Sequence, residues 1–382
     1  AWRLMKEGII VKQTRTVETL GSATVICTDK TGTITENRME MAWAYVHDGE
    51  EVIDQGVWST LPAQHLLRTA MWASEPVPFD PMEKVLHESY GKLPDDQRAN
   101  YQLIHEYPLG GKPPRMTHVF ANAAGNRIVA CKGAPEGIIR NSGLTDDQQK
   151  IVLGKVQEAA TKGLRVLAVA ESEWTGGEFP KDQHELPLKF LGLVGFYDPP
   201  KENIREVFDQ FNEAGIQLKI ITGDNAFTTE AIACQAGFRH ADQLSDGGDL
   251  MKLDDSEFDK QCLRTFLFTR MYPEAKLRVI QSLKKQNHIV AMTGDGVNDG
   301  PALKAAHIGI AMGKRGTEIA KQAASLIITD DNLGKMIAAI AMGRKIYANL
   351  KKAIQYIISI HIPIVLTVSI PLLLGWIFPN IF

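Results

Sequence analysis

Three apolar runs, each followed by a short polar cluster, constrain the fold more than any other feature of the sequence. They contain ICTDKTGTIT at residues 26–35, QLKIITGD at 217–224 and HIVAMTGDGVND at 288–299. Short apolar runs bounded by turn residues are typical of buried strands, and helical stretches separate the later runs. Alternating strands and helices predict an α/β fold with a doubly wound parallel sheet, which binds ligands at the carboxyl ends of its strands. The three polar clusters should therefore share one edge of the sheet.

A long insertion interrupts this pattern. Asp29 and Thr222 are 193 residues apart in the sequence, which is far more than one crossover helix needs. We therefore expect the α/β domain to comprise residues 1–40 and 188–335, with a separate α+β domain inserted over residues 41–187.

The C-terminal part of the chain predicts a membrane span. Residues 353–378 contain no Asp, Glu, Lys or Arg, and about 20 apolar residues suffice to cross a bilayer. Lys351 and Lys352 precede this stretch, and basic flanks favour the cytosolic side. We expect a transmembrane helix in contact with membrane lipid over 353–378, a stalk helix over 336–352, and all of residues 1–352 in the cytosol. A buried helix of a soluble core is the alternative.

Composition excludes two other classes of protein. The net charge is −3, so no basic excess points to nucleic acid as a partner. The four cysteines are far apart and lack any CxxC spacing, which indicates neither a cysteine zinc site nor a disulfide framework. A reducing compartment fits this pattern best.

The polar clusters combine groups suited to phosphoryl chemistry. Crowded carboxylates repel one another unless a cation joins them, and Mg²⁺ is the hard ion that binds through oxygen ligands. A phosphoryl group needs hydroxyl and ammonium donors such as Thr222 and Lys276. Asp29 is then a candidate nucleophile that forms an aspartyl phosphate. A single TGD is usually a turn that closes a strand, so the interpretation depends on the whole set. The expected edge residues are Asp29, Lys30, Thr31, Thr33, Thr222, Gly223, Asp224, Lys276, Thr293, Gly294, Asp295, Asn298 and Asp299.

The motifs DKTGTITEN, KGAPE, DPP, TGDN and TGDGVND occur in this order. In this respect the chain resembles the P-type cation-transporting ATPases, membrane pumps of the haloacid dehalogenase superfamily, over nearly its whole length. The resemblance implies ATP-driven cation transport with Asp29 as the phosphorylated residue. It implies that Asp29, Asp295 and the carbonyl of Thr31 bind Mg²⁺, and that Lys276 and Thr222 hold the phosphoryl group. The other residues implied are Asp224 in a catalytic role and Gly223, Asn298 and Asp299 in support.

Thr31 separates this chain from many soluble members of the superfamily. In those relatives the residue two positions after the nucleophile is a second Asp, the acid and base that hydrolyses the intermediate. Without that carboxylate, water is poorly activated, so the aspartyl phosphate can persist until a conformational change uses it. This disfavours the alternative function, a haloacid dehalogenase phosphatase with a membrane anchor.

The inserted block resembles the nucleotide-binding domain of these pumps. The resemblance places Lys132 and Gly133 of KGAPE against ATP and Glu83 of FDPMEK near adenine. It also places Arg165 of GLRVLA near the phosphates, for which a surface salt bridge is the alternative, and adds Arg270 of FTRMYPEAK.

The residue that would stack on adenine departs from the family pattern. The pumps usually carry an aromatic residue where YPLGGK offers Leu109. The substitutes that the sequence leaves open are Tyr107, or apolar contact alone.

The motifs leave the transported cation open. KGAPE disfavours the heavy-metal branch, and bacterial calcium-type pumps are the most similar group. In calcium and sodium pumps the fifth membrane helix carries a carboxylate where this chain has Ile364, one turn after His361. A histidine inside a span is a candidate functional residue, although a packing role is equally compatible. The chain is expected to start after the fourth membrane helix and stop after the fifth, so the remaining membrane helices and the actuator domain of the parent pump would be its partners.

Overall fold

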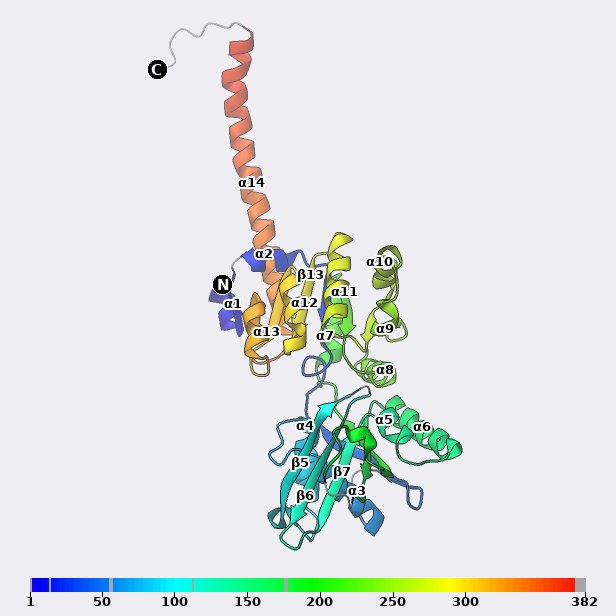
Figure 1. The fold of residues 1–382 in the computed structure, drawn as a ribbon. Coiled ribbons are helices and arrows are strands. Elements are labelled where there is room, and N and C mark those ends of the chain that lie inside the picture. Colours follow the sequence, from blue (N-terminus) through cyan, green and yellow to red (C-terminus); the bar gives the residue numbers. More distant parts are fainter. Residues whose placement is uncertain (1, 14, 55–57, 112, 175–177, 375–382) are drawn as a thin grey trace.

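Two sheets in two separate domains and one long helix make up the molecule (Figure 1). The computed structural model describes residues 2–13, 15–54, 58–111, 113–174 and 178–374. In Figure 1 the upper domain contains the eight-stranded sheet and the lower domain the seven-stranded sheet, while the long helix rises from the upper domain.

The eight-stranded sheet has the order β1-β15-β14-β13-β2-β10-β12-β11. All of its neighbouring strands are parallel except β1, which is antiparallel to β15. The predicted doubly wound sheet is therefore confirmed. Its strands are β1 (Ile9–Val11), β2 (Val25–Thr28), β10 (Gln217–Ile221), β11 (Leu244–Asp246), β12 (Leu267–Thr269), β13 (Val290–Gly294), β14 (Ile308–Met312) and β15 (Leu326–Ile328).

Helices cover both faces of this sheet, which explains its continuous apolar strands. Ile26 of β2 packs into one core cluster, whereas Val25 and Cys27 pack into another on the opposite face. The first face is covered by α2 (Arg15–Gly21), α7 (Ile204–Glu213) and α8 (Ala226–Gln235), and the second by α10 (Asp255–Arg264), α11 (Pro273–Lys285), α12 (Gly300–Ala305) and α13 (Glu318–Ala323). The remaining short helices of this domain are α1 (Trp2–Lys6), α9 (Gly247–Leu250) and η3 (Val297–Asp299).

The second domain is an antiparallel sheet with helices on both faces, in strand order β4-β3-β9-β8-β7-β6-β5. Its strands are β3 (Glu40–Val46), β4 (Glu51–Asp54), β5 (Tyr101–Gly110), β6 (Arg115–Asn122), β7 (Arg127–Gly133), β8 (Arg165–Glu171) and β9 (Lys189–Tyr197). Its helices are α3 (Leu61–Trp72), α4 (Pro81–Tyr90), η1 (Arg98–Asn100), α5 (Pro135–Arg140), α6 (Asp146–Thr161) and η2 (Gln183–Glu185). It is the expected α+β insertion.

The predicted end of the insertion at residue 187 is wrong. Strand β9 pairs with β3 and β8 in the antiparallel sheet, so the insertion extends to Tyr197. The sequence misleads here because β9 is buried on both faces in the middle of its sheet, and such a strand reads like one from a parallel sheet.

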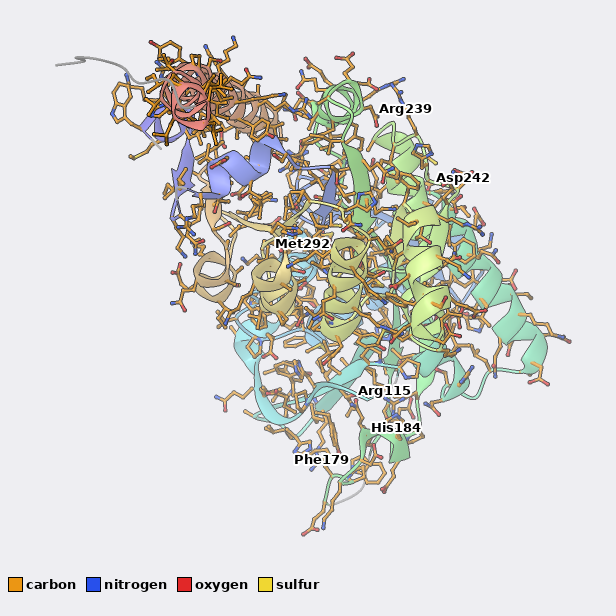
Figure 2. The ribbon with its side chains drawn as sticks, turned by 90° about the horizontal axis from the view of Figure 1, so that it is seen from above. Arg115, Phe179, His184, Arg239, Asp242 and Met292 are labelled. Atoms are coloured by element: carbon orange, nitrogen blue, oxygen red, sulfur yellow. The ribbon has the colours of Figure 1, made fainter. Side chains whose placement is uncertain are left out.

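The long helix α14 (Lys335–Leu373) is continuous through Pro363 and Pro371. Among the described residues it is the one helix long and apolar enough to cross a membrane, with a mean hydropathy of 2.0 over an 18-residue window of which 6% is buried. The predicted stalk and span thus belong to the same helix, and positions 375–378 of the predicted span lie outside the described residues. Figure 2 shows α14 end on, at one side of the molecule and away from Met292 of β13.

Two glycines allow the base of α14 to pack closely on α2. A Cβ atom on Gly343 would lie 2.5 Å from the carbonyl oxygen of Val17 and 2.7 Å from the nitrogen of Gly21. A Cβ atom on Gly21 would lie 2.4 Å from the carbonyl carbon of Gly343. Because these neighbours are backbone atoms, the helices would have to move apart to admit a side chain.

We predict that Gly343→Ala lowers the free energy of unfolding by about 1–3 kcal/mol, the usual cost of overpacking. Gly154→Ala is the matched control, because Gly154 lies within α6 and a Cβ atom on it would meet nothing within 4 Å. That change should stabilise the chain by up to about 1 kcal/mol through helix propensity. Urea unfolding of both variants in detergent measures the difference, and shifts of the same sign would contradict the close α2–α14 contact.

Candidate active site

The three polar clusters meet at the carboxyl edge of the eight-stranded sheet. Strand β2 lies between β10 and β13, and Thr28 is in register with Ile220 on one side and Thr293 on the other. Asp29, Thr222 and Asp295 each follow the end of one of these strands. The order of the strands therefore brings together residues that are far apart in the sequence.

A lysine and three carboxylates form the centre of the site. Lys276 of α11 donates to Asp299 with Nζ 2.7 Å from Oδ1, and the same Nζ lies 3.5 Å from Oδ2 of Asp29. Carboxylate oxygens of Asp29, Asp295 and Asp299 all lie within 4.8 Å of one another. Asp299 is almost fully buried, whereas Asp29 retains some exposure at its side chain. Of the two carboxylates that contact the Lys276 ammonium, Asp29 is thus the one that is accessible from solvent.

The charges of this cluster are not balanced by Lys276 alone. Burial raises the pKa of Asp29 to about 6, against the effect of Lys276 and with the help of Asp299 and Asp295. Burial and the charge of Asp299 raise the pKa of Asp295 to about 6. Although burial favours the neutral amine, Asp29 and Asp299 raise the pKa of Lys276. Crowded oxygen ligands with excess negative charge fit a hard dication such as Mg²⁺.

Glycine is required where the loop after β2 approaches Asp295. Gly32 has a φ of +73°, and a Cβ atom on it would lie 3.0 Å from Oδ2 of Asp295. The loop also orients the nucleophile candidate, because the backbone N–H of Lys30 donates to Oδ1 of Asp29 at 2.8 Å. Thr31 is half-buried between these residues.

A second glycine and a carboxylate shape the loop after β13. Both Asp295 and Gly296 donate their backbone N–H to Oδ2 of Asp299, at 3.3 and 3.2 Å. A Cβ atom on Gly294 would lie 2.6 Å from Cβ of Asp299. Asp299 therefore fixes the loop that carries Asp295, while Asn298 stays exposed in the same turn.

The loop after β10 faces the other domain. Asp224 donates its backbone N–H to Oγ1 of Thr222 at 3.2 Å, so Gly223 is the turn between them. The carboxylate of Asp224 forms ion pairs with Lys30 and with Arg165 at the start of β8. Asp224 thus lies outside the Asp29 cluster and joins the two domains.

Glu83, Lys132 and Gly133 lie together in the antiparallel domain. Lys132 donates through Nζ to Oε1 of Glu83 and to Oγ of Ser74, both at 2.6 Å. Burial lowers the pKa of Lys132, although Glu83 opposes that shift. A Cβ atom on Gly133 would lie 2.6 Å from Cα of Arg115, so only glycine fits beside strand β6.

The two predicted nucleotide-binding arginines are not part of this group. Arg165 pairs with the buried Asp224 of the other domain, which is an ion pair between domains and not the surface salt bridge given as the alternative. Arg270 lies in the eight-stranded domain with Nε 3.8 Å from Oδ2 of Asp246 and a mostly exposed side chain. The cavity lined by Lys30, Arg165 and Asp224 measures only about 10 Å³, so the domains are closed on each other at this point.

Tyr107 does not replace the missing aromatic residue. Its hydroxyl donates to the carbonyl oxygen of Pro180 at 2.5 Å, and its ring packs in a core cluster with Cys131. Lys132 follows Cys131 on β7 and points to the opposite face. Leu109 is 66% exposed and remains the residue available for apolar contact.

Asp198 belongs to the DPP motif, and the motif alone gave it no role. Oδ2 of Asp198 accepts from Oγ1 of Thr35 at 2.6 Å, and Oδ1 accepts from the backbone N–H of Arg38 at 3.2 Å. Lys201 donates through Nζ to the carbonyl oxygens of Gly32 at 3.0 Å and Asp331 at 2.7 Å. These hydrogen bonds hold together the two chain segments that connect the domains. The DPP motif is the sequence signal that could have identified Asp198 as a structural residue.

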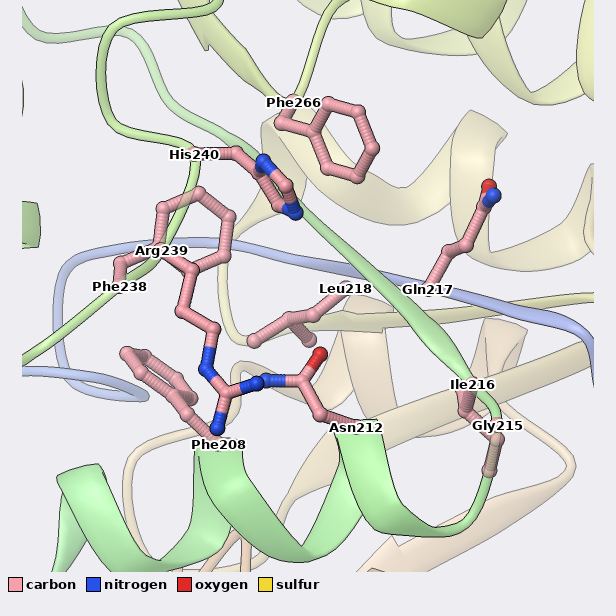
Figure 3. A pocket seen from close by; sticks show the side chains of 10 residues that line it. All are labelled: Phe208, Asn212, Gly215, Ile216, Gln217, Leu218, Phe238, Arg239, His240 and Phe266. Atoms are coloured by element: carbon pink, nitrogen blue, oxygen red, sulfur yellow. The ribbon is translucent and has the colours of Figure 1, made fainter.

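A larger cavity, of about 300 Å³, lies at the opposite edge of the eight-stranded sheet (Figure 3). Figure 3 shows Phe208, Phe238 and Phe266 around it, together with Arg239. Its lining includes Gln217, the first residue of β10, whereas Thr222 follows the last. The cavity is therefore separate from the Asp29 cluster.

Comparison with known proteins agrees with this geometry. Residues 23–307 match the haloacid dehalogenase-like hydrolase family. The chain is 32% identical to a calcium-transporting ATPase of Bacillus subtilis, over 98% of this chain and 46% of that protein. It is 33% identical to the cation-transporting ATPase pma1 of Synechocystis, over 98% of this chain and 46% of that protein.

A third relative is the calcium-transporting ATPase type 2C member 1 of Bos taurus, 32% identical over 99% of this chain and 42% of that protein. The chain spans about half the length of the curated relatives it matches. It therefore belongs to the haloacid dehalogenase-like hydrolases, and its predicted resemblance to the P-type cation-transporting ATPases is confirmed.

Proposed function

We propose that the chain is the catalytic part of an ATP-driven cation pump and that Asp29 becomes phosphorylated during each cycle. The observation that carries this proposal is Asp29 itself, which follows β2 with Oδ2 3.5 Å from Nζ of Lys276. In the reaction an oxygen of Asp29 attacks the γ-phosphorus of ATP, the bond to the bridging oxygen breaks, and ADP leaves. The test is covalent labelling of the chain by ATP, which a change of Asp29 to Asn should abolish.

Each residue around Asp29 has a separate task in this step. The Lys30 N–H holds Oδ1 of Asp29 at 2.8 Å, so the carboxylate keeps one orientation during attack. Lys276 and the hydroxyl of Thr222 are donors for the phosphoryl oxygens, whose charge grows in the transition state. Asp29, Asp295 and the carbonyl of Thr31 would hold Mg²⁺, which when bound neutralises charge between the nucleophile and the phosphoryl group.

The residue that would hydrolyse the product of this step is missing from its usual position. A threonine at position 31 has no carboxylate to remove a proton from water. This supports a phosphoenzyme that lasts long enough to be coupled to movement of the domains, and it argues against the phosphatase alternative.

Residues 40–197 are proposed to bind ATP, and residues 1–39 and 198–334 to receive the phosphoryl group. In the antiparallel domain, Lys132 donates a hydrogen bond to Glu83. Where the two domains touch, Arg165 and Lys30 both pair with Asp224. Cations at these places support a path for a polyphosphate between the domains. Because the cavity at Asp224 is only about 10 Å³, the domains would have to open before ATP can enter.

We predict that Lys132→Ala weakens ATP binding by about 10-fold or more, because it removes a charged hydrogen-bond donor. A 10-fold change in affinity corresponds to about 1.4 kcal/mol of binding free energy. The control is Lys150→Ala, which removes a lysine whose side chain is 77% exposed in the same domain. Titration of the full chain in detergent with ATP and Mg²⁺ measures both, and thermal unfolding checks that the variants fold. Equal affinities for both variants would remove Lys132 from the nucleotide site.

Helix α14 is proposed to connect the catalytic domains to the membrane, with residues 1–352 on the cytosolic side. Two of the relatives described above are named as calcium-transporting ATPases, so Ca²⁺ is the transported cation we propose. Uptake into vesicles that contain the full-length gene product tests it, with Ca²⁺ compared against H⁺, Na⁺, K⁺ and Mg²⁺. Uptake of another cation but not of Ca²⁺ would reject this choice and leave the phosphorylation proposal intact.

A further inference from the structure

We propose that the antiparallel domain contains a binding site for a transition-metal dication such as Zn²⁺, formed by His118, Glu75 and Glu106. Their ligand atoms, one from each side chain, all lie within 4.8 Å of one another. Glu106 of β5 is directly opposite His118 of β6 in the sheet register, and Glu75 comes from the chain that follows α3. Three segments of the domain therefore converge on one point.

The orientation of His118 supplies an unused metal ligand. Its Nδ1 lies 2.9 Å from the carbonyl oxygen of Ser74. A carbonyl can only accept, so Nδ1 carries the proton and Nε2 of the neutral ring has a free lone pair. The side chain is fully buried, and Nε2 has no hydrogen-bond partner among the described residues. Metal-binding histidines usually donate their other ring nitrogen to a carbonyl or carboxylate in this way.

The distances favour a shared ion over a direct ion pair. Nε2 of His118 lies 4.0 Å from Oε1 of Glu75, which is too far for a hydrogen bond. A protonated ring would therefore leave a buried N–H without a hydrogen-bond partner, which is unfavourable. Two ligands of one tetrahedral Zn²⁺, each bound at about 2.0–2.2 Å, lie roughly 3.3–3.6 Å apart. The observed spacing is slightly longer, and a small rotation of the partly exposed Glu75 side chain would bring both atoms onto a single ion.

The ligand types indicate which metal would bind. One imidazole nitrogen and two carboxylates suit Zn²⁺ and other transition metals, whereas Mg²⁺ and Ca²⁺ prefer sites made only of oxygen. Glu106 is exposed and Glu75 is partly exposed, so an ion can enter from solvent and keep a water as a further ligand. The oxygen-only cluster at Asp29 would be left to Mg²⁺.

Ser74 connects this site to the proposed nucleotide-binding residues. Its carbonyl oxygen accepts from His118, and its Oγ accepts from Nζ of Lys132 at 2.6 Å. A metal bound to His118 would thus be linked to Lys132 through the single residue Ser74. The metal site itself does not depend on the role of Lys132, so the two proposals can fail separately.

The test is Zn²⁺ binding to the full chain in detergent, measured by competition with a chromophoric zinc indicator in excess Mg²⁺ to occupy the Asp29 cluster. We expect one Zn²⁺ per chain, with affinity reduced at least about 10-fold by Glu106→Gln and by His118→Asn, because each removes one metal–ligand bond. Asparagine retains a donor for the Ser74 carbonyl, and the exposed Glu106 can be changed without disturbing the core. Co²⁺ in place of Zn²⁺ should show the visible absorption of a nitrogen- and oxygen-ligated site.

The control is His65→Gln, which disrupts an exposed histidine–glutamate pair between His65 and Glu171 at 2.8 Å that offers only two ligands. This variant should bind Zn²⁺ as the unmodified chain does. The proposal is overturned if no stoichiometric Zn²⁺ binds, or if Glu106→Gln and His118→Asn bind as tightly as the unmodified chain. Loss of binding in His65→Gln alone would assign the zinc to that surface pair instead.

Discussion

Asp29→Asn should abolish covalent labelling of the chain by γ-³²P-labelled ATP. The variant keeps the shape of the side chain and removes the charged oxygen that attacks phosphorus. Lys276 and the Lys30 N–H would still surround the position, but they have no nucleophile to assist. We expect the label to fall by at least about 1,000-fold, as for other residues on which a covalent step depends.

The chemical stability of the label distinguishes phosphorylation of Asp29 from phosphorylation of a serine or threonine. An acyl phosphate on Asp29 survives acid and is released by hydroxylamine, unlike a phosphoserine or phosphothreonine. Asp242→Asn serves as the control, since Asp242 is exposed and lies at the surface of the molecule in Figure 2. Label in Asp29→Asn at the level of Asp242→Asn would show that another residue is phosphorylated.

The sequence alone predicts the eight-stranded sheet and the edge at which its polar clusters meet. Strands β2, β10 and β13 are short and buried over nearly all of their length, and Asp29, Thr222 and Asp295 follow their last residues. Parallel strands bring such residues together whatever their distance in the sequence. Local pattern and chain topology therefore agree in this domain.

The limits of the insertion are harder to predict because β9 carries no alternation of apolar and polar residues. It is an interior strand of an antiparallel sheet, between β3 and β8, with helices on both sides. Buried strands of this kind look alike in parallel and antiparallel sheets. The boundary depends on strand pairing over long sequence distances, which the residues of β9 alone do not specify.

The contacts between the domains are also beyond the sequence pattern. The family resemblance places Arg165 near ATP, yet in this closed arrangement it pairs with Asp224 of the other domain. The partners of Asp198 are Thr35 and Arg38, more than 150 residues earlier in the chain. Such pairs depend on how the two segments that connect the domains are placed in space. Neither hydrophobic periodicity nor a turn motif predicts that placement.

Lys276→Met should reduce phosphorylation by about 100- to 1,000-fold, the usual effect of removing a donor that stabilises transition-state charge. The same change leaves Asp29 and Asp299 buried without their shared ammonium. Removing one partner of a buried pair costs about 3–5 kcal/mol, so urea unfolding should also show a clear loss. Excess Mg²⁺ should return part of that stability, because a cation that binds only the folded cluster favours the folded state.

Lys285→Met separates the site effect from the loss of any lysine on α11. Lys285 lies on the same helix, and its pair with Asp259 is at the surface, with 68% of the lysine side chain exposed. An exposed pair contributes little to stability, and Lys285 is at the opposite end of α11 from Lys276, so labelling should be unchanged. Equal losses of label in both variants would mean that α11, and not the charge of Lys276, is what phosphorylation requires. Loss of stability without loss of label in Lys276→Met would mean that the ammonium only compensates the carboxylates and takes no part in phosphoryl transfer.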